Sequence, residues 1–204
     1  MMAKLFYIHD PMCSWCWGFQ PTWLEIQAKL ASTIEVEYVM GGLAADSDEP
    51  MPIETQQMVK AAWSRIQKTL GANFNFDFWD KNIPRRSTYP ACRAVLSAKR
   101  QDKEMEMINA IQHAYYLKAL NPSDDDVLIG LADELKLDVD RFVQDLNSTK
   151  IQSELNKQVQ LSRSLTQRGF PSLVLKHNGQ YYFIRHDYIK SGVSLDLIDE
   201  ILIS

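Results

Sequence analysis

Residues 4–19 read KLFYIHDPMCSWCWGF, and this stretch decides how the chain is organised. Its first part, residues 4–9, is apolar on both alternating faces, which is typical of a central strand covered on both sides. An Asp-Pro pair then ends the strand, and residues 17–30 continue with apolar positions at a helical period. Cys13 and Cys16 therefore fall where a strand ends and a helix begins.

The remaining pattern predicts an α/β fold. Residues 34–39 alternate as a second strand, which completes a β-α-β unit with a parallel pair and a right-handed crossover. More than a hundred residues of mostly helical pattern follow. The period then returns to two in residues 173–176 and 181–184, on either side of the hairpin signal Asn178-Gly179, and residues 194–202 form a last amphipathic helix. We expect the order β-α-β, a large all-helical insertion, then β-β-α.

Length and composition suit an ordinary globular protein. The chain has 204 residues, of which 46% are hydrophobic and 24% charged, with a net charge of −4. We expect residues 1–45 plus 165–204 to form the α/β domain and residues 46–164 the helical insertion. The acidic balance and the lack of a basic run argue against nucleic-acid binding. There is neither an apolar run of membrane length nor a signal-peptide core, so we expect a cytoplasmic protein that does not contact membranes.

The cysteine pair predicts disulfide chemistry. Disulfide exchange needs a thiolate that attacks and a second thiol that resolves the mixed disulfide. At a helix start the positive end of the helix dipole favours a thiolate on Cys13, and Cys16 lies about one turn further in. The alternative is half of a zinc site, but no paired ligand spacing is found among the remaining candidates, which are Cys92, His9, His113, His177 and His186. We therefore expect no metal and no cofactor beyond the redox-active Cys13–Cys16 disulfide.

A family resemblance rests on two short motifs. The motif of residues 13–18 after a first strand, the long helical insert and the late Gly169-Phe170-Pro171 together resemble the DsbA-like branch of the thioredoxin superfamily. The chain is most similar to the FrnE-like, predicted protein-disulfide-isomerase members. The resemblance implies a thioredoxin-like fold, with a cis bond between Phe170 and Pro171 beside the cysteines and Phe170 presenting its backbone to substrate. The alternative is that Pro171 merely starts an edge strand.

One position departs from the family pattern. Relatives often carry a buried acid on the first strand, six residues before the first cysteine, and here that position is Tyr7. The acid would assist proton transfer to and from the resolving thiol, so we consider His9 or water as its substitute. Ser14 and Trp15, between the cysteines, also differ from better-known pairs, and they modulate the thiolate and its potential.

Apolar residues around the cysteines predict a surface for polypeptide. Met12, Trp15, Trp17 and Phe170 are candidates for an apolar collar that would suit unfolded or partly folded substrate. We expect Trp17 to pack in the core and Trp15 to be exposed. Cys92 lies on an apolar helical face, where a free cysteine behaves as a small hydrophobe and a bystander to the chemistry. The alternative is a third redox partner that contacts the site from the insertion.

Two charged features receive structural interpretations. Arg85-Arg86 is expected to be a solvated corner. Residues 124–126, three aspartates, are expected to cap a helix and complement its dipole, because no calcium-loop spacing follows them.

The sequence therefore predicts a protein thiol–disulfide oxidoreductase, either a reductase or an isomerase, that acts through a mixed disulfide on Cys13. Its expected partners are protein or peptide thiols and disulfides, with glutathione as a further candidate. Two alternatives remain open: a glutathione-dependent transferase or isomerase of small molecules with the same fold, and a redox-sensing holdase or adaptor without turnover. The sequence gives no signal for the oligomeric state.

Overall fold

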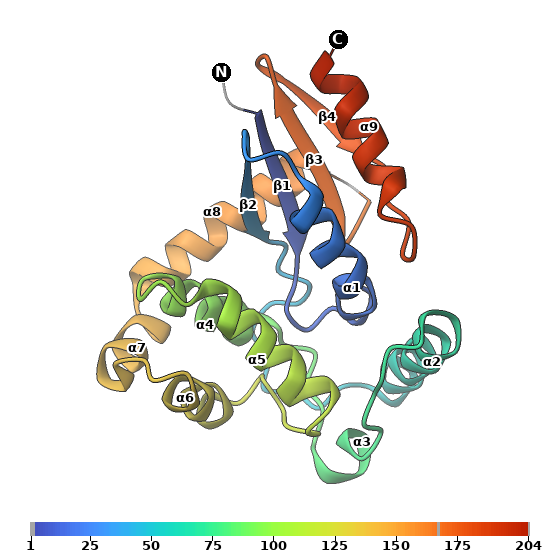
Figure 1. The fold of residues 1–204 in the computed structure, drawn as a ribbon. Coiled ribbons are helices and arrows are strands. Elements are labelled where there is room, and N and C mark those ends of the chain that lie inside the picture. Colours follow the sequence, from blue (N-terminus) through green and yellow to red (C-terminus); the bar gives the residue numbers. More distant parts are fainter. Residues whose placement is uncertain (1–2, 167, 204) are drawn as a thin grey trace.

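A four-stranded mixed sheet organises the computed structural model, which describes residues 3–166 and 168–203 (Figure 1). The strand order is β2-β1-β3-β4. Strand β2 runs parallel to β1, whereas β3 is antiparallel to β1 and β4 is antiparallel to β3. The strands are β1 (Ala3–His9), β2 (Ile34–Met40), β3 (Ser172–His177) and β4 (Gln180–Ile184).

Helices account for most of the chain and follow the predicted order. The described residues form the helices α1 (Ser14–Lys29), α2 (Ile53–Leu70), α3 (Phe78–Lys81), α4 (Tyr89–Lys99), α5 (Glu104–Tyr116), α6 (Asp125–Glu134), α7 (Val139–Leu146), α8 (Thr149–Leu165) and α9 (Gly192–Ile203). The expected α/β fold, β-α-β before and β-β-α after a large helical insertion, is confirmed. No helix in the described part of the chain is both long enough and apolar enough to cross a membrane.

The sheet lies between two layers of helix, as Figure 1 shows. Helices α1 and α9 pack together on one face, and α8 crosses the other face beside β2. On the α8 face, Phe6 and Ile8 of β1 form a separate apolar cluster with Val39 and Val174, against which Leu161 of α8 packs. The opposite face of β1 belongs to the main core. Strand β1 is thus covered on both sides, as its apolar pattern predicted.

Helix α8 also joins the sheet to the insertion. It contacts β2 as well as α4 and α7, and the side chain of Gln158 accepts a hydrogen bond of 2.8 Å from the Met40 backbone N–H at the end of β2. The boundaries expected at residues 45/46 and 164/165 stay a prediction.

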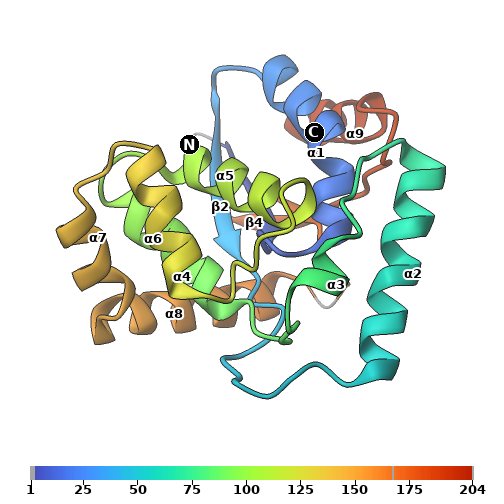
Figure 2. The same ribbon diagram turned by 90° about the horizontal axis from the view of Figure 1, so that it is seen from below.

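The insertion has an aromatic core around Trp63 of α2. Its indole is fully buried, and its ring centroid lies 5.1 Å from that of Phe74 and 5.0 Å from that of Trp79. We expected residues 74–79 to be a partly extended loop that packs inward. The inward packing is confirmed, but the extended backbone is wrong at the end of the segment, because Asn75 accepts a hydrogen bond from the Asp77 N–H and coils the chain into α3. Figure 2 shows α2 and α3 on the opposite side of the molecule from α6 and α7.

Candidate active site

The junction of β1 and α1 positions the two cysteines. Cys13 occupies the N-cap position of α1 with an extended backbone (φ −80°, ψ 114°), and its N–H donates to the Asp10 carbonyl at 3.0 Å. Cys16 lies in the first turn of the helix, and no acidic residue accompanies it there. The helix N-terminus therefore presents its unpaired N–H groups and positive dipole end to the Cys13 sulfur, and no carboxylate of the first helical turn competes for them.

Cys13 lies against the loop that precedes β3. Its Sγ is 3.8 Å from the carbonyl oxygen of Phe170, although the two residues are 157 positions apart. The Phe170–Pro171 peptide bond is cis, and Gly169 has a φ of +80°. Pro171 leads into β3, which pairs with β1 on one side and with β4 on the other, so it does not begin an edge strand.

Cys16 is the inner thiol of the pair. It is fully buried, and burial raises its pKa well above the usual value of a thiol, while a hydrogen bond with the Cys13 thiol raises that pKa further. Both cysteines are free, as is Cys92. The arrangement provides an outer sulfur at a helix N-terminus, in contact with an inner thiol that stays protonated at neutral pH.

A buried carboxylate lies beneath this junction, and the sequence interpretation missed it. One oxygen of Asp10 accepts a hydrogen bond from the Met12 N–H at 2.8 Å. The other accepts from the Leu43 N–H and the Thr88 hydroxyl, each at 2.7 Å, and from the Cys92 thiol at 3.5 Å. Burial raises the pKa of Asp10, although these donors act in the opposite direction.

The Asp10 contacts also account for Cys92. Its thiol is fully buried in α4, and burial raises its pKa well above the usual value, with the Asp10 carboxylate contributing in the same direction. A protonated, inaccessible thiol is a poor nucleophile. Cys92 is thus a hydrogen-bond donor to Asp10, and its part in the chemistry stays a prediction.

His9 and Tyr7 lie next to the pair on β1. The ring of His9 stacks on Tyr7 with centroids 5.0 Å apart and meets Tyr38 edge-on at 5.5 Å. Among the residues that the structure describes, neither ring nitrogen of His9 has a hydrogen-bond partner. Burial lowers the pKa of His9 to about 3 and raises that of Tyr7 well above its usual value, so both side chains are uncharged at neutral pH.

The apolar collar is only partly at the surface. Trp17 belongs to the core, as expected: its Nε1 donates to the Asn73 carbonyl at 3.0 Å, and its ring stacks on Tyr116. Trp15 is half-buried rather than freely exposed, because its ring meets that of Tyr188 edge-on at 5.2 Å and Arg65 lies over it.

A pocket of about 380 Å³ opens beside Cys13. Met12, Ser14, Trp15 and Phe170 line it together with the sulfur of the outer cysteine, so the structure brings these predicted site residues together. Its other walls are mostly apolar and come from the loops after β2 and before β3, from α2 and its N-terminal flank, from the 85–88 segment and from α5. These residues are Leu43, Met51, Met58, Val59, Ala62, Arg85, Arg86, Thr88, Tyr115 and Gly169. An apolar pocket with a few polar groups is typical of a binding site.

The two arginines of this pocket differ. Arg85 donates to the Ser123 carbonyl at 2.9 Å and forms an ion pair with Asp124, so the expectation of a solvated corner is wrong for this residue. Asp124 occupies the N-cap position of α6 and Asp125 and Asp126 lie in its first turn, as expected, but the Asp124 carboxylate pairs with Arg85 and makes no capping hydrogen bond. Arg86 is exposed and pairs with no carboxylate among the described residues.

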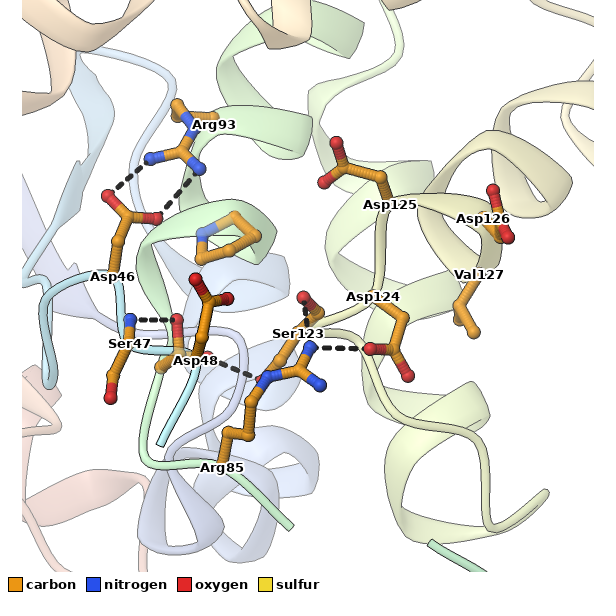
Figure 3. Close-up of a pocket in the computed structure, with 12 residues that line it drawn as sticks. Asp46, Ser47, Asp48, Arg85, Arg93, Ser123, Asp124, Asp125, Asp126 and Val127 are labelled. Atoms are coloured by element: carbon orange, nitrogen blue, oxygen red, sulfur yellow. Dashed lines mark hydrogen bonds and ion pairs between the residues drawn. The ribbon is translucent and has the colours of Figure 1, made fainter. Parts of the chain in front are cut away.

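A second hollow lies on the other side of Arg85, and Figure 3 shows it. It measures about 550 Å³ and is lined by several aspartates, one of which, Asp46, forms two hydrogen bonds of 2.8 Å with Arg93. No cysteine lines it. Within residues 3–166 and 168–203, no group of three or more His, Cys, Asp or Glu side chains is arranged to hold a metal ion.

Comparison with known families supports the fold. A family model described as Thioredoxin matches residues 6–182. Among solved structures, a candidate protein disulfide isomerase from Nitrosomonas europaea is 28% identical with a TM-score of 0.86, and the alignment covers 100% of this chain and 98% of that one. The cytosolic disulfide reductase DsbM from Pseudomonas aeruginosa is 22% identical with a TM-score of 0.79, and the alignment covers 98% and 100% of the two chains. The predicted thioredoxin-like fold of the DsbA type is confirmed.

The curated relatives that match this chain carry another name. The ClpXP adapter protein SpxH of Halalkalibacterium halodurans is 22% identical over 84% of this chain and 58% of its own length. The protein of the same name from Bacillus subtilis is 19% identical over 98% of this chain and 66% of its own length. The chain thus spans about three-fifths of the length of these relatives.

Proposed function

This chain belongs to the thioredoxin family, and from that premise we propose that it is a protein thiol–disulfide oxidoreductase acting through Cys13. One observation carries the proposal: the Cys13 sulfur lies at the N-terminus of α1, 3.8 Å from the Phe170 carbonyl, with the buried Cys16 thiol in contact behind it. An attacking sulfur and a resolving thiol are the two parts that disulfide exchange requires.

The reaction proceeds in two steps. The Cys13 thiolate attacks one sulfur of a substrate disulfide, so that a Cys13–substrate bond forms and the first substrate thiolate leaves and takes up a proton. Cys16, after losing its proton, then attacks the Cys13 sulfur and releases the second substrate thiol. The substrate disulfide is reduced by two electrons and the Cys13–Cys16 pair is oxidised. Two molecules of a low-molecular-weight thiol such as glutathione then reduce the pair to the dithiol and are themselves oxidised to their disulfide.

The pocket beside Cys13 supports a peptide as the substrate. Its walls are mostly apolar, and Phe170 offers a backbone carbonyl next to the sulfur, which suits an extended segment bound by main-chain hydrogen bonds. The exposed Arg86 would favour an acidic group near the substrate disulfide. We propose that the protein reduces substrate disulfides and that it does so in the cytoplasm. The similar structure named as a cytosolic disulfide reductase supports both parts of this proposal.

Reduction of insulin by the purified protein tests the proposal. With glutathione as reductant, Cys13→Ser should abolish turnover, and Cys16→Ser should accumulate a mixed disulfide that mass spectrometry detects on Cys13. The matched control is Cys92→Ser, which should keep turnover within about twofold because that thiol is buried and protonated. Undiminished insulin reduction by Cys13→Ser would overturn the proposal. Scrambled ribonuclease distinguishes an isomerase, which would restore its activity without net reduction.

A second candidate function is that of an adaptor. The observation that favours it is the name shared by the curated relatives, which are adapter proteins of the ClpXP protease. Such a role would use the apolar pocket and would not need turnover. A Cys13→Ser, Cys16→Ser double variant separates the two: an adaptor would still promote degradation of its client by purified ClpXP, whereas an oxidoreductase would lose all effect on its substrate.

The third alternative, a glutathione-dependent transferase or isomerase, is disfavoured by the intact cysteine pair. Tight calorimetric binding of glutathione without any activity on protein disulfides would reverse that ranking.

A further inference from the structure

We propose that the pocket beside Cys13 contains a carboxylate-binding subsite around Arg86, which selects peptide disulfides that carry a carboxylate next to the disulfide. The inference rests on the proposed function and names the substrate class that the pocket favours. Arg86 supplies the charge of the subsite, and the hydroxyl groups of Ser14 and Tyr115 supply further donors.

The donors of this subsite are free to bind a ligand. The side chains of Arg86, Tyr115 and Ser14 line the pocket, and within the described part of the chain their polar groups form no hydrogen bond or ion pair. Burial and the Asp10 charge raise the pKa of Tyr115, so its hydroxyl stays protonated at neutral pH. The Arg86 charge acts on that pKa in the opposite direction, which indicates that the guanidinium lies near the Tyr115 hydroxyl. A guanidinium and hydroxyl groups are all donors that a carboxylate can accept from.

The two sides of the 85–86 segment carry opposite charge. Arg85 turns away from the Cys13 pocket into the second hollow, which several aspartates line, and Asp124 neutralises it there (Figure 3). No Asp or Glu is among the described residues that line the Cys13 pocket. The charge of Arg86 is therefore uncompensated, and the positive dipole end of α1 adds to it at the same place. An acidic group of the substrate would supply the missing counter-charge.

The backbone that carries Arg86 is fixed relative to the Cys13 sulfur. On one side, Arg85 is anchored by the contacts described above. On the other side, the Thr88 hydroxyl donates to the Asp10 carboxylate at 2.7 Å, and the backbone carbonyl of Asp10 accepts from the Cys13 N–H at 3.0 Å. The segment of the cation and the turn of the reacting sulfur thus share Asp10 as an anchor. Little of the binding energy is then spent on ordering the backbone of the subsite.

The rest of the pocket defines the remaining part of the substrate. Met58, Val59 and Ala62 of α2 form an apolar wall, of which Met58 is exposed. An apolar substrate side chain fits against this wall, while a carboxylate binds Arg86. The carboxylate also comes near the Cys13 thiolate, and two negative charges repel each other. Without Arg86, an acidic substrate would therefore react no faster than a neutral one.

The test compares peptide disulfides that differ in a single charge. The substrates are the homodimeric disulfides of acetyl-Leu-Cys-X-amide, in which X is Glu, Gln or Lys. Reduced protein, freed of reductant, is mixed with each disulfide, samples are quenched in acid, and chromatography measures the released peptide thiol. The dependence of the rate on peptide concentration separates the apparent affinity from the maximal rate. A fourth peptide, with Gln and a free C-terminal carboxylate, distinguishes a terminal carboxylate from an acidic side chain.

We expect the unmodified protein to react about fivefold faster with the Glu peptide than with the Gln peptide at low concentration, as one ion pair at a partly exposed site provides. The difference should lie in the apparent affinity and not in the maximal rate, because Arg86 does not touch the reacting sulfurs. In about 0.5 M KCl the preference should fall below about twofold, because salt screens exposed charges. A faster reaction of the free acid than of its amide also supports the subsite and assigns it to a chain terminus.

Variants of Arg86 separate its charge from a structural role. Arg86→Gln should remove the preference for the Glu peptide, Arg86→Lys should keep part of it, and Arg86→Glu should reverse it in favour of the Lys peptide. A residue that only supports the fold would not produce such a reversal. The matched control is Arg141→Gln, which makes the same change in net charge on an exposed residue of α7, on the opposite side of the molecule from α2 (Figure 2). It should keep the preference of the unmodified protein.

Two results would overturn the inference: equal rates for the peptides with and without a carboxylate, or a preference that survives in Arg86→Gln. Both leave the proposed function intact, because the disulfides are still reduced. Failure of the unmodified protein to reduce any of the peptides would instead overturn the proposed function, so the two failures are distinguishable.

Discussion

Replacing Gly41 with alanine would drive a methyl group into the ring of Phe170. Gly41 directly follows β2, and its N–H donates to the His9 carbonyl. A Cβ at this position would lie 2.2 Å from two carbons of the Phe170 ring, where ordinary contact begins at 3.4 Å. The ring must therefore move away by about 1.2 Å. This movement should also displace the backbone of Phe170, whose carbonyl contacts the Cys13 sulfur.

The size of the effect follows from this geometry. Overpacking of a well-packed site costs about 1–3 kcal/mol, and we expect about 1–2 kcal/mol here because the half-buried Phe170 ring can turn toward solvent. For a chain of this length that corresponds to a fall in Tm of about 2–8 °C. Activity should suffer more than stability, since a displacement of about 1 Å in a positioning group can reduce a rate about 100-fold.

The measurements are calorimetric melting and insulin reduction, with Gly130→Ala as the matched control. Gly130 lies inside α6, and a Cβ there would meet nothing within 4 Å. The Gly130→Ala variant should therefore have a slightly higher Tm, because alanine is about 1 kcal/mol more favourable than glycine inside a helix. Its rate of insulin reduction should be unchanged. A Gly41→Ala protein with an unchanged Tm and an unchanged rate would show that Phe170 does not position the Cys13 sulfur.

Three further predictions concern stability. His9 has a folded pKa of about 3 against 6.5 when unfolded, so the unfolded chain binds more protons between these values, and the free energy of unfolding should fall by about 1.4 kcal/mol per pH unit as the pH drops through that window. Urea titrations should show this slope in the unmodified protein and not in His9→Phe; equal slopes would refute it. Cys92→Ala should destabilise the fold by about 1–2 kcal/mol, since Asp10 loses a donor and a small void opens, yet leave insulin reduction within twofold; a loss of turnover would make Cys92 a redox partner. Trp63→Ala should cost about 3–5 kcal/mol in chemical denaturation, because a fully buried indole is removed from the aromatic core, and a cost under 1 kcal/mol would contradict the packing described.

Local signals explain what could be predicted from the sequence. The strand at residues 4–9, the helix that follows it and the position of Cys13 and Cys16 between them all depend on neighbouring residues, and each is present in the structure. The hairpin around Asn178-Gly179 likewise depends on its own turn residues, and it joins β3 and β4.

The rest depends on residues that are distant in the chain. Asp10 was interpreted only as the residue that ends a strand, because its partners Leu43, Thr88 and Cys92 are 33 to 82 positions away. A local clue was nevertheless available: an aspartate two residues before an N–H that it can accept from is the pattern of an Asx turn, which the bond from Met12 completes. The pairing of Arg85 with Asp124, 39 positions apart, had no such clue.

The hydrogen bonds of Asp10 limit how this protein can be shortened. A fragment that kept the sheet and discarded residues 46–164 would remove Thr88 and Cys92, and it would leave one oxygen of the charged carboxylate with only the Leu43 N–H as a donor. That charge would either draw in solvent or unravel the turn that carries Cys13. Engineering of a minimal redox domain from this scaffold should therefore begin by replacing the carboxylate, and not by trimming helices.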